Sequence, residues 1–529
     1  MDLRRVFFIL GFFIIIFIIW KIWKFSVNSY TNQSLYQNYH VNSKNYLNKN
    51  IISIKTDVLY IKINLEGGDI EQVKLLNFKN KLNSSEPLIL LDTQDNFLYQ
   101  TRSGLIGKDG LDNWNTITRP VYKTQYKCFE LSNSKEELRI PLVYTSHDGI
   151  KYIKTFIFKP KSYDIKIEYT IHNNTNRNLE MSMFGGLRQT ISTPDDKSSN
   201  NFYLQTFRGA AYSTDNTKYE KYQFDSVFRK KKLHVMTHNG WIAMLQQYFV
   251  SAWIPNNIQL NTFYTNNIDS NTIEIGFYSN TMYVNPKSTM TCSSKLWIGP
   301  EIQEKMAVLA PNLDLTVDYG WLWFLSQPLF KLLKLLNNIV GNWGVSIILI
   351  TFIMRGAMYP LTKAQYKTMS KMKILQPKID KIKHNYKNNR QKMSEEMLIL
   401  YKNEKINPLG GCFPLLIQMP IFLALYYMLI NSVELRHAPF IWWIKDLSGS
   451  DPYYVLPILM GITMFIIQQI TPTNISDPVQ KKVLYVVPII FTTFFLWFPS
   501  GLVLYYIVSN LVTIIQQKLI SNQFDNINK

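Results

Sequence analysis

Long apolar runs gather at the two ends of this chain of 529 residues, and the stretch between them alternates apolar with polar positions. The first run covers residues 6–20 and follows two arginines, and five more runs crowd the chain after residue 342. A helix that crosses a bilayer needs about 20 mainly apolar residues, so each run predicts a short membrane span. We expect six transmembrane helices, at residues 1–24, 342–360, 411–432, 453–470, 483–498 and 500–520.

Residues 25–320 show the period of two that is typical of β-strands. One face of a predicted strand carries Ile165, Ile167, Tyr169 and Ile171, and its other face carries Lys166, Glu168 and Thr170. Regular short strands with turn signals predict a large all-β domain, built as an antiparallel sandwich. Residues 321–341 follow it and place Lys331, Lys334 and Asn338 on one stripe of an apolar helix. This pattern indicates an amphipathic helix that lies flat on the membrane.

The loop at residues 361–410 carries twelve Lys and Arg residues against four acids. Because loops on the cytoplasmic side are enriched in Lys and Arg, we expect this loop inside the cell. The six spans then place both termini, the loop 471–482 and the tail 521–529 in the cytoplasm. The β domain and the loop 433–452 lie outside.

Apolar residues recur at helical spacing in two blocks of the basic loop, and they predict an antiparallel helical hairpin. The blocks are Met372, Leu375, Ile379 and Ile382, then Met393, Met397, Leu400 and Tyr401. The basic outer face is either simply solvated or a site for anionic lipid headgroups or ribosomal RNA. The candidate contact residues are Lys363, Lys367, Lys371, Lys378, Lys381 and Asp477.

Several classes of protein are disfavoured by what the chain lacks. Its apolar runs hold no Asp, Glu or paired His, which argues against ion-coupled transport, proton pumping and haem binding. There is no Gly-rich phosphate loop, and His234-x-x-x-His238 lacks the Glu of a zinc-protease motif. Three cysteines make no disulfide framework, although pairing of Cys128 with Cys292 stays open. We therefore expect no enzyme, no cofactor and no metal.

One charged residue, Arg355, lies at the end of the apolar run that starts at Trp343. A lone arginine near the middle of a bilayer helix costs about 3 kcal/mol on insertion scales. Its side chain therefore either snorkels to the inner headgroups or sits in a wet groove. Helical spacing puts Thr351, Arg355 and Tyr359 on one polar stripe.

Further polar residues in later spans extend this candidate groove, which would open to the cytoplasm. They are Gln418, Thr513 and Gln517. Flexible methionine and aromatic side chains near these positions predict an apolar surface, here called the slide, along which an incoming helix could move. The slide candidates are Met419, Phe422, Tyr505 and Tyr506.

Three long motifs, at residues 355–365, 407–420 and 498–506, resemble the Oxa/YidC/Alb family of membrane protein insertases. Shorter similarities to its Gram-negative branch lie at residues 206–212, 244–249 and 296–300. The resemblance implies a five-helix insertase core, a periplasmic β-supersandwich and a place in the bacterial inner membrane. It also implies an insertase and chaperone for nascent membrane proteins, working alone or with the Sec translocon. The ribosome and anionic lipids are further expected partners, and DNA is not.

Two features depart from the family pattern. The hairpin tip Asn388-Asn389 lacks the acids often found there, and the tail after Ile520 is short and barely basic. Both argue against ribosome docking assisted by the tail. From the residues alone, a lipid scramblase or a passive anchor for the β domain stays open as an alternative, although a passive anchor has no need of Arg355.

Overall fold

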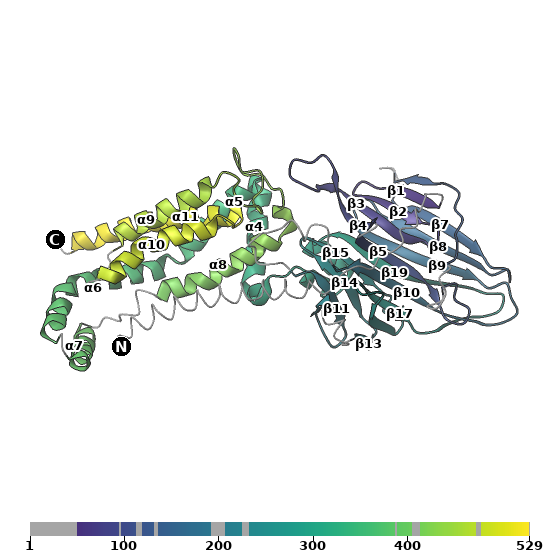
Figure 1. Ribbon diagram of the computed structural model, residues 1–529, viewed down its shortest axis with the longest axis horizontal. Coiled ribbons are helices and arrows are strands. Elements are labelled where there is room, and N and C mark those ends of the chain that lie inside the picture. Colours follow the sequence, from purple (N-terminus) through teal and green to yellow (C-terminus); the bar gives the residue numbers. More distant parts are fainter. Residues whose placement is uncertain are drawn as a thin grey trace. The chain divides into compact units, whose positions relative to one another are not determined.

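The computed structural model describes residues 50–94, 97–112, 119–131, 136–191, 207–224, 232–386, 389–404, 413–471 and 478–527. These residues form a β-sheet domain and a group of helices (Figure 1). The predicted span at residues 1–24 lies outside the described residues, as do Asp477 and the first part of the motif at 407–420.

The β domain contains a larger and a smaller sheet. The larger, eleven-stranded sheet consists of β1 (Ile51–Lys55), β2 (Leu59–Asn64), β3 (Asp69–Lys79), β4 (Pro87–Gln94), β5 (Phe97–Ile106), β6 (Cys128–Glu130), β10 (Leu179–Thr190), β13 (His234–Thr237), β16 (Asn261–Asn267), β17 (Thr272–Ser279) and β18 (Met282–Val284). The eight-stranded sheet consists of β7 (Leu138–Thr145), β8 (Lys151–Phe158), β9 (Asp164–His172), β11 (Gly209–Thr214), β12 (Glu220–Tyr222), β14 (Gly240–Gln246), β15 (Phe249–Ile254) and β19 (Thr289–Pro300).

Strand order in the larger sheet is β13-β16-β17-β10-β5-β4-β3-β2-β1-β6, with β18 paired to β10. The smaller sheet has the order β12-β11-β14-β15-β19-β9-β8-β7. The parallel pair is β1 with β6, whereas β8 and β9, like β9 and β19, run antiparallel. Along β9 buried and half-buried residues alternate, with Ile165, Ile167 and Ile171 on the buried face. The period-two prediction for this strand is therefore confirmed.

The two sheets bury their inner faces against each other in one apolar core. Trp253 of β15 is fully buried, and its indole Nε1 donates a 2.9 Å hydrogen bond to the Thr101 hydroxyl of β5 in the opposite sheet. A Cβ at Gly185 of β10 would lie 2.6 Å from Phe277 and 2.9 Å from the Trp253 ring, so only glycine leaves room for these aromatics. The predicted all-β domain is thus confirmed as two packed sheets.

A lysine in this core links the sheets. Lys154 of β8 has no exposed surface, and its amine donates to the backbone oxygens of Gly67, Gly68 and Ser103 at 3.0, 2.8 and 3.1 Å. Both glycines have positive φ, 75° and 64°, which aims these carbonyls inward. Burial lowers the pKa of Lys154 to about 7, because taking a charge out of water disfavours the charged form.

The helices follow the β domain in the chain. They are α3 (Gln303–Leu309), α4 (Trp323–Val340), α5 (Trp343–Ala357), α6 (Tyr359–Asn385), α7 (Arg390–Asn403), α8 (Phe413–Asn431), α9 (Val455–Ile470), α10 (Pro478–Phe495) and α11 (Ser500–Ile527), with short 3₁₀ turns at Leu313–Thr316, Gly320–Leu322 and Val433–Leu435. Within the described residues, one stretch, Ser500–Ile520, is long and apolar enough to cross a membrane by itself. Shorter apolar helices lie at Gln418–Asn431, Val455–Ile470 and Tyr485–Phe495.

Helix α5 is shorter than the span predicted at residues 342–360. The Asn342 side chain caps its first turn by accepting a 3.1 Å hydrogen bond from the Val345 amide. The helix ends at Ala357, and α6 leaves its direction by 59°. Pro360 explains the break, because proline has no N–H for a helical hydrogen bond and its ring clashes with the preceding turn. At the start of α6 the same proline is tolerated.

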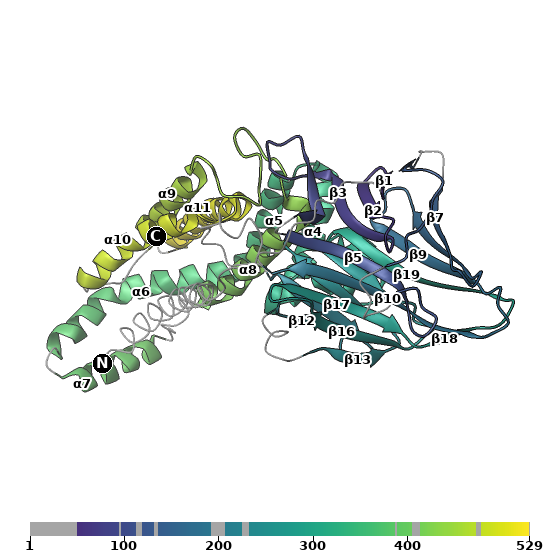
Figure 2. The same cartoon turned by 45° about the vertical axis from the view of Figure 1, so that its right-hand side comes forward.

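Helices α6 and α7 form the predicted hairpin (Figure 2). Leu375 and Ile379 of α6 pack against Tyr401 of α7 in a small apolar seam, which Met372, Met397 and Leu400 complete. Lys378 pairs with Glu404 beyond the end of α7 at 2.8 Å. The hairpin prediction and its seam are therefore confirmed.

The segment predicted as an interfacial helix forms α4. Its Leu329, Phe330 and Leu333 are buried, whereas Trp323 and Ile339 are exposed, at 58 % and 75 %. The helix thus offers apolar side chains both to its neighbours α5 and α8 and to its surroundings.

Candidate functional site

Arg355 lies in the last turn of α5 with 7 % of its surface exposed. Its Nε donates a 2.7 Å hydrogen bond to the Ser509 hydroxyl of α11, and its Nη2 donates to the same oxygen. A guanidinium has five N–H donors, so three of them have no partner within the part of the chain that the structure describes. No described carboxylate pairs with it either. Arg355 is therefore a buried positive charge with incomplete hydrogen bonding.

Neutral groups complete the surroundings of this arginine. The ionisable side chains that interact with it are Tyr366, Tyr505 and Tyr506. Gln516 donates a 3.2 Å hydrogen bond from its side-chain amide to the backbone oxygen of Arg355. The carbonyl oxygen of that amide is itself buried without a partner among the described residues. The site therefore keeps both unused donors and an unused acceptor close to a full positive charge.

A line of polar residues on one face of α11 extends the site. Asn510 donates a 3.0 Å hydrogen bond to the hydroxyl of Thr463 in α9, and Gln517 accepts one of 3.3 Å from Thr471 beyond the end of α9. The Thr513 hydroxyl turns back to the Ser509 carbonyl at 2.8 Å. Polar contacts thus tie α11 to α5 on one side and to α9 on the other.

The other predicted groove residues lie on different helices. Thr351 is fully buried one turn before Arg355, with its hydroxyl 2.6 Å from the Ile347 carbonyl. The expected stripe stops at Arg355, because Tyr359 opens α6 after the 59° bend. Gln418 lies half-buried in α8. Among the described residues, Thr513 and Gln517 lie on α11 without a hydrogen bond to Arg355, and Tyr359 lies on a different helix axis.

Ser509, Asn510 and Thr463 are not among the groove residues predicted from the sequence. A usable signal exists for the first two, because Ser509, Asn510, Thr513, Gln516 and Gln517 recur at three- and four-residue spacing in an apolar helix. Thr463 stands alone among apolar residues of α9. Its role follows only from the contact with Asn510.

Aromatic rings from three helices form a cluster beside the polar site. Phe422 of α8 lies 5.8 Å from the Tyr506 ring and 6.0 Å from the Phe495 ring, measured between centroids. Phe495 and Tyr506 are 5.5 Å apart. Two of the predicted slide residues therefore meet here. Tyr505 is instead buried toward Arg355, and Met419 is 52 % exposed on α8.

The lysines proposed for lipid or ribosome contact all lie on α6. Lys363, Lys367, Lys371, Lys378 and Lys381 are exposed. The sixth candidate, Asp477, lies outside the described residues.

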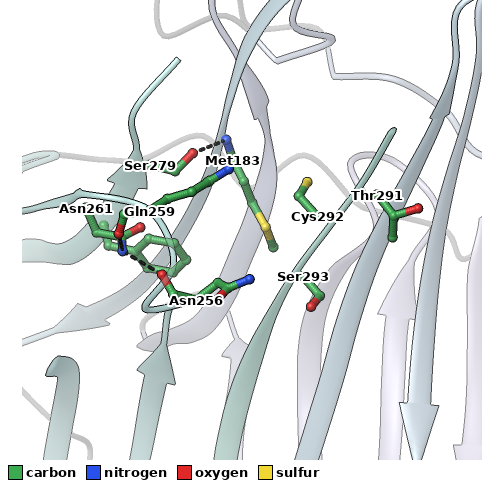
Figure 3. Close-up of a pocket in the computed structure, with 9 residues that line it drawn as sticks. Met183, Asn256, Gln259, Asn261, Ser279, Thr291, Cys292 and Ser293 are labelled. Carbon is green, nitrogen blue, oxygen red and sulfur yellow. Dashed lines mark hydrogen bonds between the residues drawn. The ribbon is translucent and has the colours of Figure 1, made fainter. Parts of the chain in front are cut away.

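The β domain has a small polar pocket of its own (Figure 3). Met183 of β10, Cys292 of β19 and Gln259 of the β15–β16 connection line it, so it lies between the two sheets. Cys292 and Cys128 are both free thiols, so the pairing that the sequence allowed does not form. Burial raises the pKa of the Cys292 thiol to about 12, which keeps it protonated and unreactive.

Comparisons with known proteins cover nearly the whole chain. The family model of the YidC periplasmic domain matches residues 51–332, and that of the 60Kd inner membrane protein matches residues 335–527. The Membrane protein insertase YidC of Buchnera aphidicola subsp. Baizongia pistaciae is 61 % identical over 528 residues, which is 98 % of each chain. Its counterpart from Buchnera aphidicola subsp. Acyrthosiphon pisum (strain 5A) is 56 % identical over 531 residues, 99 % of each chain.

A crystal structure of an active YidC insertase with its first transmembrane domain resolved aligns with 90 % of this chain and 92 % of its own. Its sequence identity is 18 % and the TM-score is 0.39.

Together with the β-sheet domain and the apolar helices, the two family models define an inner-membrane protein with a helical membrane core and a large periplasmic domain. This class matches the prediction from the sequence. The chain belongs to the YidC family of membrane protein insertases, a family that is not one of catalytic enzymes. The resemblance seen in the motifs is therefore confirmed.

Proposed function

We propose that this chain inserts nascent membrane proteins into the inner membrane through a water-filled groove around Arg355. The observation that carries the proposal is the buried guanidinium with three unused donors and no carboxylate among the described residues. A guanidinium with so little exposed surface is stable only where water or a polar guest completes its hydrogen bonds. A polar or acidic segment of a client is such a guest.

The groove acts by lowering a barrier rather than by covalent chemistry. A hydrophilic tail that enters the bilayer loses its hydration, and each unsatisfied backbone group then costs several kcal/mol. Donors and acceptors of Arg355, Gln516 and Gln418 replace part of that hydration. The ring cluster of Phe422 and Tyr506 offers an apolar surface to the client's transmembrane helix. The client thus meets polar and apolar contacts side by side.

We further propose a topology of six crossings with both termini in the cytoplasm. In this topology α5, α8, α9, α10 and α11 make up the five-helix core and α4 lies flat at the periplasmic surface. Short apolar helices such as Val455–Ile470 fit a locally thinned bilayer. The α6–α7 hairpin then faces the cytoplasm, where a ribosome delivers clients, and the Sec translocon is a partner for larger clients.

The test replaces Arg355 in a Gram-negative host whose own insertase is depleted. Arg355→Ala is expected to impair insertion of small, singly spanning clients, because the positive charge is lost. Arg355→Lys is expected to preserve most of it, because a lysine keeps the charge. Protease protection of the client's translocated tail is the measurement. Normal insertion of every client by the Ala variant would overturn the groove mechanism.

A second test separates an insertase from a lipid scramblase. A photocrosslinker at Thr351 or Tyr506 is expected to capture nascent helices from stalled ribosomes. Phe352, next to Thr351 but 52 % exposed, is the matched control position and is expected to capture lipid. Capture of lipid alone at all three positions would favour the scramblase.

A further inference from the structure

A stripe of cationic residues runs along one flank of α6. Its members are Lys363, Lys367, Lys371, Ile374, Lys378 and Lys381, at intervals of three and four residues, and all are exposed. Because residues three and four apart lie on one face of a helix, the stripe is continuous over about 17 Å from Lys363 to Ile374, and Pro377 interrupts the helical hydrogen bonds beyond that point. One uncharged member, Ile374, stands in its middle.

The positive charge of this stripe is mostly unbalanced. Lys378 pairs with Glu404 at 2.8 Å. The other four lysines have no acidic partner among the described residues. Asp380 of the same helix lies 3.9 Å from Lys383, outside the stripe. The stripe therefore suits a partner that carries several negative charges along a line or a surface.

Ile374 distinguishes between two such partners. It is 66 % exposed, although just over one turn further the similar Ile379 is buried in the hairpin seam. A nucleic-acid backbone offers phosphates to lysines and nothing to an exposed isoleucine. The headgroup region of a bilayer accepts both, since amphipathic helices there bury apolar side chains between flanking lysines. The stripe therefore fits a membrane surface better than RNA.

The direction of α6 keeps its first half near that surface. The helix leaves the line of α5 by 59°. If α5 follows the membrane normal, α6 moves only about 8 Å away from the membrane between Lys363 and Ile374, which is about one Debye length at physiological salt. Long lysine side chains easily span such a height.

We propose that α6 docks on anionic phospholipids of the cytoplasmic leaflet through Lys363, Lys367 and Lys371, with Ile374 at the outer edge of the headgroup region. The docking rests on the topology of the proposed function, which places α6 in the cytoplasm. It holds the hairpin beside the cytoplasmic end of α5, close to Arg355.

The test uses the full chain in lipid nanodiscs. Ile374→Cys, in a chain whose three cysteines are replaced by serine, carries an environment-sensitive fluorophore. Discs of phosphatidylcholine alone are compared with discs that contain phosphatidylglycerol, and spin-labelled lipids quench the fluorophore on contact. Quenching is expected in the anionic discs at low salt, and it is expected to fall as salt screens the charges.

Two triple variants locate the contact. Each lysine near an anionic surface contributes about a five-fold preference, so replacement of Lys363, Lys367 and Lys371 by Gln should lower the docked-to-undocked ratio about 100-fold. Replacement of Lys383, Lys392 and Lys402 by Gln removes the same charge elsewhere on the hairpin and should leave quenching in place.

Three outcomes would overturn the proposal. The first is quenching in neutral discs that equals quenching in anionic discs, and the second is an equal loss of quenching in both triple variants. The third is a label that lipids do not quench but that added ribosomes shield from a soluble quencher, which would assign the stripe to RNA. The Arg355→Ala chain should be quenched like the unaltered chain. Failure of lipid docking can thus be told apart from failure of the insertase mechanism.

Discussion

The buried amine of Lys154 makes the stability of the β domain depend on pH. Its charged form has lost all contact with water and is held by three backbone oxygens. The charges that act on it are Asp69, Arg119, Asp112 and Arg102, of which two are positive and two negative. We expect Lys154→Met to abolish this dependence, because methionine fills similar space without a proton to lose.

The magnitude follows from the shift of the pKa from 10.5 to about 7. Below pH 7 the amine is protonated in both the folded and the unfolded chain, and the folded state bears the full cost of the buried charge. Between pH 7 and 10.5 the folded chain releases its proton while the unfolded chain keeps it, so stability rises with pH. From pH 7 to pH 9 the free energy of unfolding should rise by about 2 kcal/mol.

Pulse proteolysis of the full chain in detergent, over a series of urea concentrations, measures this gain. With a urea dependence of about 3 kcal/mol per molar, the midpoint of β-domain unfolding should move up by about 0.7 M between pH 7 and pH 9. In Lys154→Met this shift should vanish. Lys151→Met changes an exposed lysine of the same strand and should keep the shift.

Other groups also titrate in this domain, and Glu301 is one of them. Burial raises its pKa well above the usual range, with Asp318 adding to the effect and Lys221 opposing it. This carboxyl therefore favours folding less as pH rises, which opposes the effect of Lys154. The contribution of Glu301 is common to the unaltered chain and Lys154→Met, so it cancels when the two are compared. An equal change of the urea midpoint with pH in these two chains would show that Lys154 does not cause the pH dependence of stability.

Two further predictions concern single contacts. Ser509→Ala removes the hydroxyl that accepts two N–H groups of Arg355, and it should slow client insertion about three- to ten-fold, as expected for the loss of a membrane-embedded hydrogen bond. Ser509→Thr keeps the hydroxyl and should restore insertion. Equal insertion by the Ala variant would show that Arg355 needs no fixed partner. Cys128 is exposed and should react rapidly with a maleimide in the folded chain, whereas half-buried Cys292, whose pKa is raised, should react far more slowly until the chain is denatured. A disulfide-linked peptide pair in mass spectra would contradict both expectations.

Much of the local structure could be predicted because it depends on neighbours in the chain. The buried face of β9 follows from alternation of Ile165, Ile167 and Ile171 with polar residues. The hairpin seam of Leu375, Ile379 and Tyr401 follows from helical spacing. The bend after Ala357 could not be predicted from hydrophobicity, because the apolar pattern carries no record of helix direction, although Pro360 is compatible with the start of a new helix.

From the sequence alone it followed that the middle of the chain is β-sheet and that its apolar runs are helices, that β9 has one apolar face, and that no apolar run offers Arg355 an acid. These properties depend on spacing and composition. Only the tertiary structure decided that Ser509 binds Arg355, that Asn510 meets Thr463, and that Lys154 reaches the Gly67-Gly68 turn. Such partners lie 47 to 154 residues apart in the chain. Hydrogen bonds between them depend on how helices and sheets pack, and no local pattern encodes that packing.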